Sequence, residues 1–402
     1  MSEDSTVTKR AAAAEALENY SVDEILRKKI LEKIDKDSVL NAKEIGTDYS
    51  YKHEIVWINA FAFLVLHIWA LMGLYVGLTG GLSLRAFLWS KFYLPIEGVT
   101  IGAHRYYTHR SFKAKPILQA WFLLSHTIAG QNSMFTWSRD HRLHHRYSDT
   151  DADPHNSKRG FFFSHIGWLM MRKHPYVSEL GRRIDLSDLL NDKMVMLQKK
   201  YYYPLYALLA VLIPVWVPVH FFGDSWINSF LVCYALKYVL ILNGTWLVNS
   251  AAHLYGTRPY DQNLQSVESW FVSAISMGEG WHNYHHAFPW DYKTAELSEL
   301  FNFSADVIKF FEKIGLAYDL KTASPDMIRN RIKKFGDGTH YELGNDEAKS
   351  HVTAWGPLHP LNPTYNTTYK APDAILKQEG LPLFDENDVF DWTRRDFVRV
   401  AF

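Results

Sequence analysis

The chain has 402 residues, and its 43 basic and 43 acidic side chains balance to a net charge of zero. This balance provides neither a basic excess for nucleic-acid binding nor an acidic tail for a solvated interaction segment. The single cysteine, Cys233, excludes an internal disulfide framework and any CxxC metal site, which leaves histidine as the metal ligand to consider.

The first part of the chain, residues 1–54, is polar and mixed in charge. It has no run resembling the apolar core of a secretory signal peptide. We therefore expect residues 1–54 to form a cytosolic N-terminal segment.

Four apolar runs follow, each about long enough to cross the ~30 Å hydrocarbon layer as a helix. The predicted spans are about 55–78, 83–104, 204–223 and 226–254. The second is the least clean, because Arg85, Lys91 and Glu97 interrupt it. An intramembrane carboxylate such as Glu97 marks either a functional site or an ion pair between helices.

The links between these runs predict the topology. Residues 79–82 and 224–225 are so short that the four spans must form two hairpins that open toward the same side. The segment 105–203 on that side is rich in Lys and Arg, as cytosolic segments are. The sequence thus predicts an all-α integral membrane protein with both termini cytosolic. Its four spans carry a helical cytosolic cap, residues 105–203 and 255–336, and a tail, residues 337–402.

Nine of the nineteen histidines lie in three short boxes and one further motif: HRYYTH, HRLHH, NSAAH and HNYHH. They are His104, His109, His141, His144, His145, His253, His282, His285 and His286. In a helix, residues i, i+3 and i+4 share one face, so the trios at 141–145 and 282–286 could each hold a metal. His104 and His109 would lie about 140° apart around an α-helix, so they would have to clasp a metal from a helix end.

Isolated histidines such as His67, His126, His165 and His220 are more often hydrogen-bonded core residues than ligands. Adjacent buried imidazoles are costly unless a cation lies between their lone pairs. A structural zinc takes about four protein ligands and a catalytic zinc about three, so nine imidazoles indicate two adjacent redox metals. Such a pair, beside apolar helices, suits dioxygen and an aliphatic substrate.

Further polar residues could complete such a centre. Asn249 lies one helical turn before His253 and could reach a metal through a bound water. Carboxylates in or beside the boxes could orient imidazoles, although a surface ion pair is an equally good interpretation of each. They are Asp140, Asp149, Asp153 and Glu279.

The boxes and the runs WSRDHR, DPHNSKRGFFFSHIGW, TWLVNSAAHLYG and GEGWHNYHHAFPWDY resemble the membrane acyl-CoA desaturases of the stearoyl-CoA (delta-9) type, particularly the animal ones. The resemblance covers about residues 50–336. It implies a mushroom-shaped fold with four transmembrane helices in the stem, a di-iron cap and an acyl tunnel. The nine box histidines would bind two Fe²⁺ ions, with Asn249 acting through water.

The resemblance also implies a reaction and partners. The expected reaction inserts a cis double bond, at carbon 9, into a saturated fatty acyl-CoA at the endoplasmic reticulum membrane while dioxygen is reduced to water. Electrons would come from cytochrome b5, which NADH-cytochrome b5 reductase reduces. Because the chain lacks the HPGG motif of fused cytochrome b5 domains, we expect a separate carrier protein.

Substrate contacts follow from the same resemblance. Residues matching the CoA site are Asn59, Asn132, Arg139, Asp140, Arg172 and Lys173. Residues matching the tunnel bend are Gln131, Trp137, Thr245 and Trp246. Anchoring at the membrane surface is the alternative role of Arg172 and Lys173. Phe92 and Ile96 replace smaller residues at the tunnel end, so we expect them to alter chain-length preference.

Two rival functions remain open at the level of the sequence. The first is related oxygen chemistry on the same scaffold, namely hydroxylation or desaturation at another carbon. The second is a non-catalytic metal store or metal transporter. Transport needs polar residues along the spans, and the runs 55–78 and 204–223 carry no charged residue.

Overall fold

The computed structural model describes residues 45–92, 97–296 and 301–346. In these ranges helices joined by loops make up nearly all of the regular secondary structure, and there are two short antiparallel strands. They are β1 (Lys113–Ala114) and β2 (Ala317–Tyr318), which pair in the register Lys113↔Tyr318.

Three stretches of the described chain are long and apolar enough to cross a membrane, and they match three of the predicted spans. They are Trp57–Leu78, Tyr202–Phe222 and Trp226–Leu254. The predicted span 83–104 is represented by α5 (Leu84–Phe92) and the π-helix η2 (Gly98–Thr108), and residues 93–96 between them lie outside the described ranges. The four-span arrangement therefore stays a prediction.

The winding of the later spans alternates between α and π turns. Tyr202–Phe222 comprises α12 (Tyr202–Tyr206), η5 (Ala207–Leu212), α13 (Ile213–Val217) and η6 (Pro218–Phe222). Trp226–Leu254 comprises α14 (Trp226–Ser229), η7 (Phe230–Leu236), α15 (Lys237–Asn249) and α16 (Ala251–Leu254). Pro214 and Pro218 have no N–H to donate to the preceding turn, which accounts for the irregular winding of the first of these spans.

The two hairpin turns touch each other. Ser83 donates from its backbone N to Asp224 Oδ1 at 2.7 Å, and its hydroxyl donates to Asp224 Oδ2 at 2.6 Å. The side chain of Asn228 donates to the Gly81 carbonyl at 2.6 Å. Both turns therefore lie at one end of the bundle, as predicted from the short links.

The apolar core of the bundle lies between α4 (Trp57–Leu78), the tyrosine-rich α12 and the helices η7 and α15. Helix α4 packs so closely on η7 that a Cβ on Gly73 would overlap the Leu231 carbonyl. The outward face of α4 exposes large apolar side chains, among them Trp57, Phe61 and Leu64, as a lipid-facing helix would.

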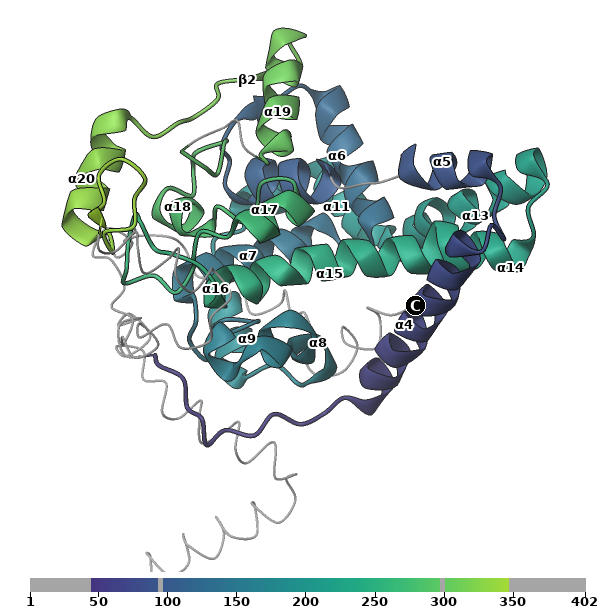
Figure 1. Cartoon of the computed structure of the whole chain (residues 1–402), viewed down its shortest axis with the longest axis horizontal. Helices are drawn as coiled ribbons and strands as arrows, with labels where there is room; N and C mark the ends of the chain where they lie inside the picture. Colours follow the sequence, from purple (N-terminus) through teal and green to yellow (C-terminus); the bar gives the residue numbers. More distant parts are fainter. Residues whose placement is uncertain (1–44, 93–96, 297–300, 347–402) are drawn as a thin grey trace, which may run out of the picture.

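The remaining helices gather at the other end of α15. They are α6 (Pro116–Ala129), α7 (Met134–Tyr147), η3 (Ser157–Arg159), η4 (Phe163–Gly167), α8 (Trp168–Met170), α9 (Pro175–Gly181), α10 (Ser187–Asn191), α11 (Lys193–Lys200), α17 (Trp270–Ser276), α18 (His282–Ala287), α19 (Phe303–Lys313) and α20 (Pro325–Phe335). Figure 1 shows α7, α16 and α18 together at this end, while α5, α13 and α14 lie at the opposite end. The histidine boxes are thus brought to one place.

Candidate metal centre

The first histidine pair is positioned by π-helical winding. His109 N donates to the His104 carbonyl at 3.2 Å, which is an i→i+5 bond, and η2 ends at this point. With about 4.4 residues per π turn, residues i and i+5 differ by only about 50° around the axis. The two rings lie 5.0 Å apart between centroids, so both point toward the same site. The predicted separation of about 140° was wrong because it assumed α-helical winding.

The nine histidines form two sets, in each of which one ring nitrogen per residue lies within 4.8 Å of all the others. The first set comprises His104, His109, His141, His145 and His285. The second set comprises His144, His253, His282 and His286. Each HxxHH trio is therefore divided between the sets: residues i and i+4 of one box join residue i+3 of the other. The sequence suggested that each trio could hold a metal, whereas the structure groups the ring nitrogens across the two boxes.

The spacing of the ring nitrogens suits a shared metal ion. In the first set, His285 Nε2 lies 2.9 Å from the Nε2 atoms of both His104 and His145. In the second set, His286 Nε2 lies 3.1 Å from His282 Nε2 and 3.3 Å from His144 Nε2. Metal–nitrogen bonds of about 2.1 Å at octahedral to tetrahedral angles place neighbouring ligand atoms about 3.0 to 3.4 Å apart.

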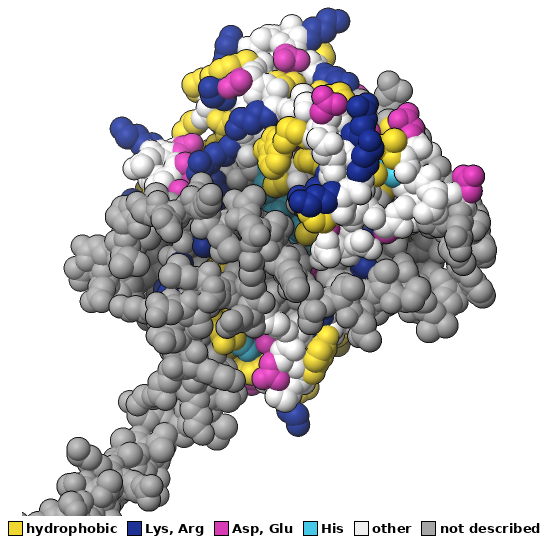
Figure 2. Space-filling view, turned by 90° about the vertical axis from the view of Figure 1, so that its left-hand side faces the viewer, with side chains coloured by type: hydrophobic (Ala, Val, Ile, Leu, Met, Phe, Trp, Pro, Cys, Tyr) yellow, Lys and Arg dark blue, Asp and Glu magenta, His cyan; other side chains and the backbone are white. Residues whose placement is uncertain are grey.

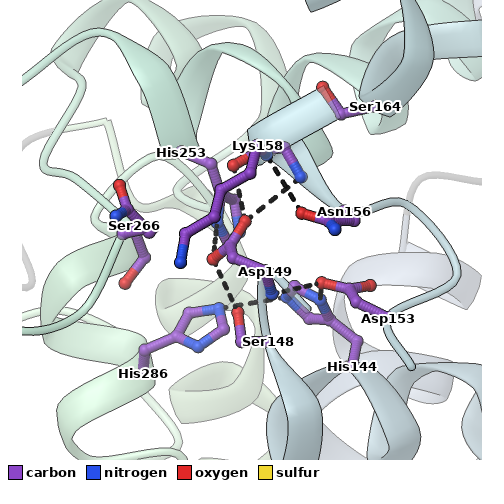
Figure 3. A network of polar contacts seen from close by, with 12 residues as sticks. His144, Ser148, Asp149, Asp153, Asn156, Lys158, Ser164, His253, Ser266 and His286 are labelled. Carbon is purple, nitrogen blue, oxygen red and sulfur yellow. Dashed lines mark hydrogen bonds and ion pairs between the residues drawn. The ribbon is translucent and has the colours of Figure 1, made fainter. Parts of the chain in front are cut away.

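Carboxylates hold the other ring nitrogen of two ligands in the second set. Asp153 Oδ2 accepts from His144 Nδ1 at 2.8 Å, and Asp149 Oδ2 accepts from His253 Nδ1 at 3.1 Å (Figure 3). The Asp149 backbone N also donates to Asp153 Oδ2 at 2.8 Å. Such bonds fix the tautomer and turn Nε2 toward the metal. The predicted orienting roles of Asp149 and Asp153 agree with this geometry.

Glu279 performs the same task in the first set. Its Oε2 atom accepts from His104 Nδ1 at 2.7 Å, and its other oxygen pairs with the buried guanidinium of Arg105. Sequence reasoning predicted Glu279 and missed Arg105. The available signal was its position directly after His104: if His104 is a buried ligand, the charged side chain next to it is buried as well and needs a counter-charge.

Electrostatics keeps most of the ligands neutral. Burial first, and then neighbouring imidazoles, lower the pKa of six histidines well below the ordinary value: His109, His141, His145, His282, His285 and His286. Burial alone would lower the pKa of His144, but the charge and hydrogen bond of Asp153 raise it. A more basic imidazole is a stronger metal ligand.

The buried ring nitrogens without a hydrogen-bond partner among the described residues include Nε2 of His109 and Nε2 of His253. Leaving buried polar atoms unpaired is costly, and a metal ion in each set would use them. The all-imidazole donors suit iron, zinc, copper or nickel. The residues therefore fit two metal ions.

The histidines expected to be core residues lie outside both sets. His67 bonds the Phe63 carbonyl, and His165 lies between Ser250 and Asn243. One further histidine, His155, was missed by sequence reasoning. It is buried, its ring lies 4.4 Å from that of His144, and its Nδ1 lies 3.5 Å from Asp153 Oδ1.

An apolar cavity of about 330 Å³ begins at the metal centre. Its polar end is lined by His104, His141, His282, Glu279 and Asn249. From there it follows α15 through Thr245, Ile241 and Lys237 to Val232 of η7. At ~1.5 Å per residue, the lining from Asn249 to Val232 extends about 25 Å. The role of Asn249 through a water stays a prediction.

Three of the four predicted bend residues lie together beside this cavity. Gln131 accepts from the Trp137 indole N–H at 3.2 Å and donates to the Thr245 hydroxyl at 2.8 Å. Trp137 and Thr245 line the cavity. Trp246 is not among the described residues that line this cavity and packs against Phe63 in the bundle core, and its role at the tunnel bend stays a prediction.

The predicted CoA residues are only partly brought together. Asp140 accepts from Arg139 at 2.7 Å and from Lys173 at 2.8 Å, and these charges lower its pKa to about 2 although burial would raise it. Asp140 therefore pairs with two cations. Among the described residues it does not orient an imidazole, which was one of the roles predicted for it. Arg172 pairs with Glu54 at 2.9 Å.

Of four further residues in the predicted substrate site, the structure describes the side chains of two. The buried Asn59 side chain donates to the Leu169 carbonyl at 3.0 Å, and Asn132 is half-buried with a positive φ of 69°. Phe92 ends α5, and its side chain is outside the described part. Ile96 lies wholly outside it. The tunnel-end role of Phe92 and Ile96 stays a prediction.

Histidine side chains are visible from outside on one face of the molecule (Figure 2). Figure 2 shows cyan histidine side chains in a hollow bordered by hydrophobic and by Lys or Arg side chains. Four of the box histidines, His109, His141, His145 and His286, are half-buried rather than fully enclosed. The metal centre thus lies near a basic surface as well as at the end of the apolar cavity.

Comparison with known proteins agrees with this site. The family model named Fatty acid desaturase matches residues 82–320. An Acyl-CoA Delta-9 desaturase of Acheta domesticus is 48% identical over 77% of this chain and 87% of its own length. An Acyl-CoA Delta12-desaturase of the same cricket is 48% identical over 72% and 82%, and Acyl-CoA desaturase 3 of Mus musculus is 47% identical over 72% and 80%. The chain belongs to the fatty acid desaturase family.

Proposed function

We propose that this protein is a di-iron acyl-CoA desaturase that inserts a cis double bond at carbon 9 of a saturated acyl chain, with dioxygen as the oxidant. One observation carries the proposal: two histidine sets with metal-ligand spacing lie at the polar end of a long apolar cavity. An unactivated methylene needs a strong oxidant and a site that holds a flexible chain: irons bound by the histidine sets would activate dioxygen, and the apolar cavity would hold the chain.

The nine box histidines would hold two Fe²⁺ ions, and those ions supply the oxygen chemistry when bound. The protein performs the remaining tasks. Trp137, Gln131 and Thr245 form a rigid hydrogen-bonded group at the cavity wall, which bends and positions the chain. The apolar lining excludes water from the reacting carbons.

The head group of the substrate would lie at the cap. The ion network of Arg139, Asp140 and Lys173 presents two cations beside one carboxylate, and cations bind CoA phosphates through charge-assisted bonds. Arg172, which pairs with the exposed Glu54, would supply a third cation. This assignment rests on the resemblance and on the proximity of these charges.

Position 9 is the finer part of the proposal. Relatives whose names state Delta-9 and Delta12 are equally identical to this chain, at 48%. Sequence identity therefore does not discriminate between these carbons, and the proposal follows the similarity of the motifs to the stearoyl-CoA type.

The electron donor would be a separate cytochrome b5, reduced by NADH-cytochrome b5 reductase, at the endoplasmic reticulum membrane. The half-buried His109, His145 and His286 support electron entry at the basic surface, because short distances favour electron transfer. Both termini would then be cytosolic, on the same side as the donor.

The test is expression in a host that lacks its own desaturase, followed by mass spectrometry of double-bond positions. We expect 9-cis products from the wild type and none from His145→Ala or His286→Ala, with all three proteins in the membrane fraction. Hydroxylated products, or double bonds at another carbon, would contradict the proposed chemistry or position. Full activity of either variant would remove that histidine from the ligand set.

A further inference from the structure

The first described residues, 45–51, lie along the cap and form what we call the N-terminal strap. The Gly46 carbonyl accepts from Asp151 N at 3.0 Å, and Asp48 N donates to Asp151 Oδ2 at 2.7 Å. The strap residue Ile45 packs against the apolar core of the cap. The strap and residue 151 are thus joined through both backbone and side chain, although they are about a hundred residues apart in the sequence.

Arg159 closes this contact from the other side. Its Nη2 atom donates to Asp151 Oδ1 at 2.6 Å and to the Asp48 carbonyl at 3.0 Å. The side chain of Asp151 is 4% exposed and that of Arg159 is 10% exposed. A buried, hydrogen-bonded ion pair has a much better-defined geometry than a surface pair. We call Asp48, Asp151 and Arg159 the strap clamp.

The strap also contacts the residues on both sides of the clamp. The Thr47 hydroxyl accepts from Asn156 Nδ2 at 2.8 Å and lies 3.5 Å from the Asp149 carbonyl. The loop 149–159 is therefore tied to the strap near its start, at residue 151 and near its end.

This loop carries both carboxylates that orient the second histidine set. Asp149 accepts from His253, and Asp153 accepts from His144. Asp149 itself has a φ of 59°, a left-handed conformation that costs free energy in a residue with a side chain and persists only where neighbouring contacts impose it. The strap clamp supplies such contacts two residues away.

We infer that the N-terminal strap is a positioning element for the second metal set: by holding loop 149–159 it aims Asp149 and Asp153 at their histidines. The inference rests on the proposed metal centre. The first set does not depend on this loop for its carboxylate, because Glu279 is held by Arg105. Loosening the strap should therefore affect one metal and spare the other.

The test compares four purified proteins in detergent, each loaded with Fe²⁺ alone: wild type, Asp151→Asn, Arg159→Gln and a chain lacking residues 1–51. Iron per chain is measured, and then iron release to an Fe²⁺ chelator is followed over time. Loss of an outer partner weakens metal binding by about 10–100-fold. We expect one of the two irons to leave about tenfold faster in all three variants, while the other leaves at the wild-type rate.

Two matched controls accompany the variants. Asp319→Asn removes a carboxylate whose partner is Lys113, in an exposed ion pair away from the metal centre. A chain lacking residues 1–40 shortens the N-terminus without touching the strap. Both controls should release iron as the wild type does.

The outcomes separate the two proposals. If the wild type binds two irons and the three variants release both at wild-type rates, the strap inference is wrong and the metal centre stands. Equal acceleration of both irons would also contradict it, since that result indicates general loosening of the cap. A wild type that binds fewer than two irons would instead overturn the metal centre itself.

Discussion

Arg105 and Glu279 form a buried ion pair directly behind His104. The guanidinium is fully buried and also donates to the Tyr292 carbonyl at 2.8 Å and to the Thr294 hydroxyl at 2.6 Å. Burial alone would raise the pKa of Glu279, but the charges of Arg105 and His104 lower it. The carboxylate therefore stays ionised and holds the His104 Nδ1 proton, which leaves Nε2 free for a metal.

Replacing Glu279 by glutamine should damage both metal binding and folding. The variant keeps the shape of the side chain but leaves Arg105 buried without its counter-charge, a change that typically costs about 3–5 kcal/mol. It also weakens the bond that orients His104, so iron affinity should fall by about 10–100-fold. Iron content at limiting Fe²⁺ and thermal unfolding measure the two effects. Glu179→Gln, which breaks an exposed pair with Arg183, is the control and should change neither.

The division of the boxes between two sets predicts the behaviour of double variants. His144 and His286 belong to the second set, so His144→Ala with His286→Ala should leave one iron bound. His145 belongs to the first set, although its ring stacks on that of His286 at 4.3 Å. His145→Ala with His286→Ala should therefore weaken both sites and leave little iron.

The alternative grouping, with one metal for each HxxHH box, predicts that a different double variant retains one iron. Under it, His144→Ala with His145→Ala would spare one iron completely, because both residues come from the HRLHH box. Iron per chain, measured for the three double variants after the same loading and desalting, discriminates between the groupings. An intact iron in the His144, His145 double variant would contradict the sets described above.

Local sequence rules predicted which histidines converge but not how they are shared. The spacing in HRLHH and HNYHH correctly placed each trio on one helical face, as the structure has it for α7 and α18. Two trios that face each other across a gap can be divided in several ways, and the choice depends on the packing of α7 against α18. That packing involves residues far apart in the sequence, so no local pattern encodes it.

The first box shows a different limit. The i, i+5 spacing of His104 and His109 is unfavourable in an α-helix and favourable in a π-helix, so the spacing itself was the signal. The supporting residues were harder to predict. Arg105 and the strap clamp stabilise ligands through bonds between residues separated by about a hundred or more positions, and only the three-dimensional fold reveals them.

Glu268 should make stability depend on pH in a direction unusual for a carboxylate. Burial raises its pKa to about 8, although it accepts a hydrogen bond from Tyr284 N at 2.8 Å. Because the folded protein holds the proton more tightly than the unfolded chain does, the stabilisation is complete below pH 4.5 and is lost as pH rises toward 8.

Glu268→Gln removes this titration while keeping an acceptor for Tyr284. We expect the variant to unfold at a higher temperature than the wild type at pH 8, and at the same temperature as the wild type near pH 4.5. Thermal unfolding in detergent across this pH range measures the difference. Glu342→Gln, at an exposed position, is the control. A constant difference between Glu268→Gln and the wild type at all pH values would contradict the assignment.

The cavity wall offers a direct test of where the acyl chain runs. Gly244 lines the cavity on α15, and apart from its chain neighbours and the backbone of its own helix, the nearest atom to a Cβ added there is Ile275 Cγ2, at 3.8 Å. A leucine at 244 should therefore enter the cavity rather than distort the backbone, and it should favour the helix by up to about 1 kcal/mol. Next to Thr245, where we propose that the tunnel bends, its side chain would obstruct the part of the chain beyond the reacting carbons. Gly244→Leu should thus lower desaturation of longer acyl-CoA substrates several-fold more than that of shorter ones. The control is Gly77→Leu on the exposed face of α4, where a Cβ meets nothing within 4 Å, and it should leave the chain-length preference unchanged. An unchanged chain-length preference in Gly244→Leu would show that the acyl chain runs elsewhere.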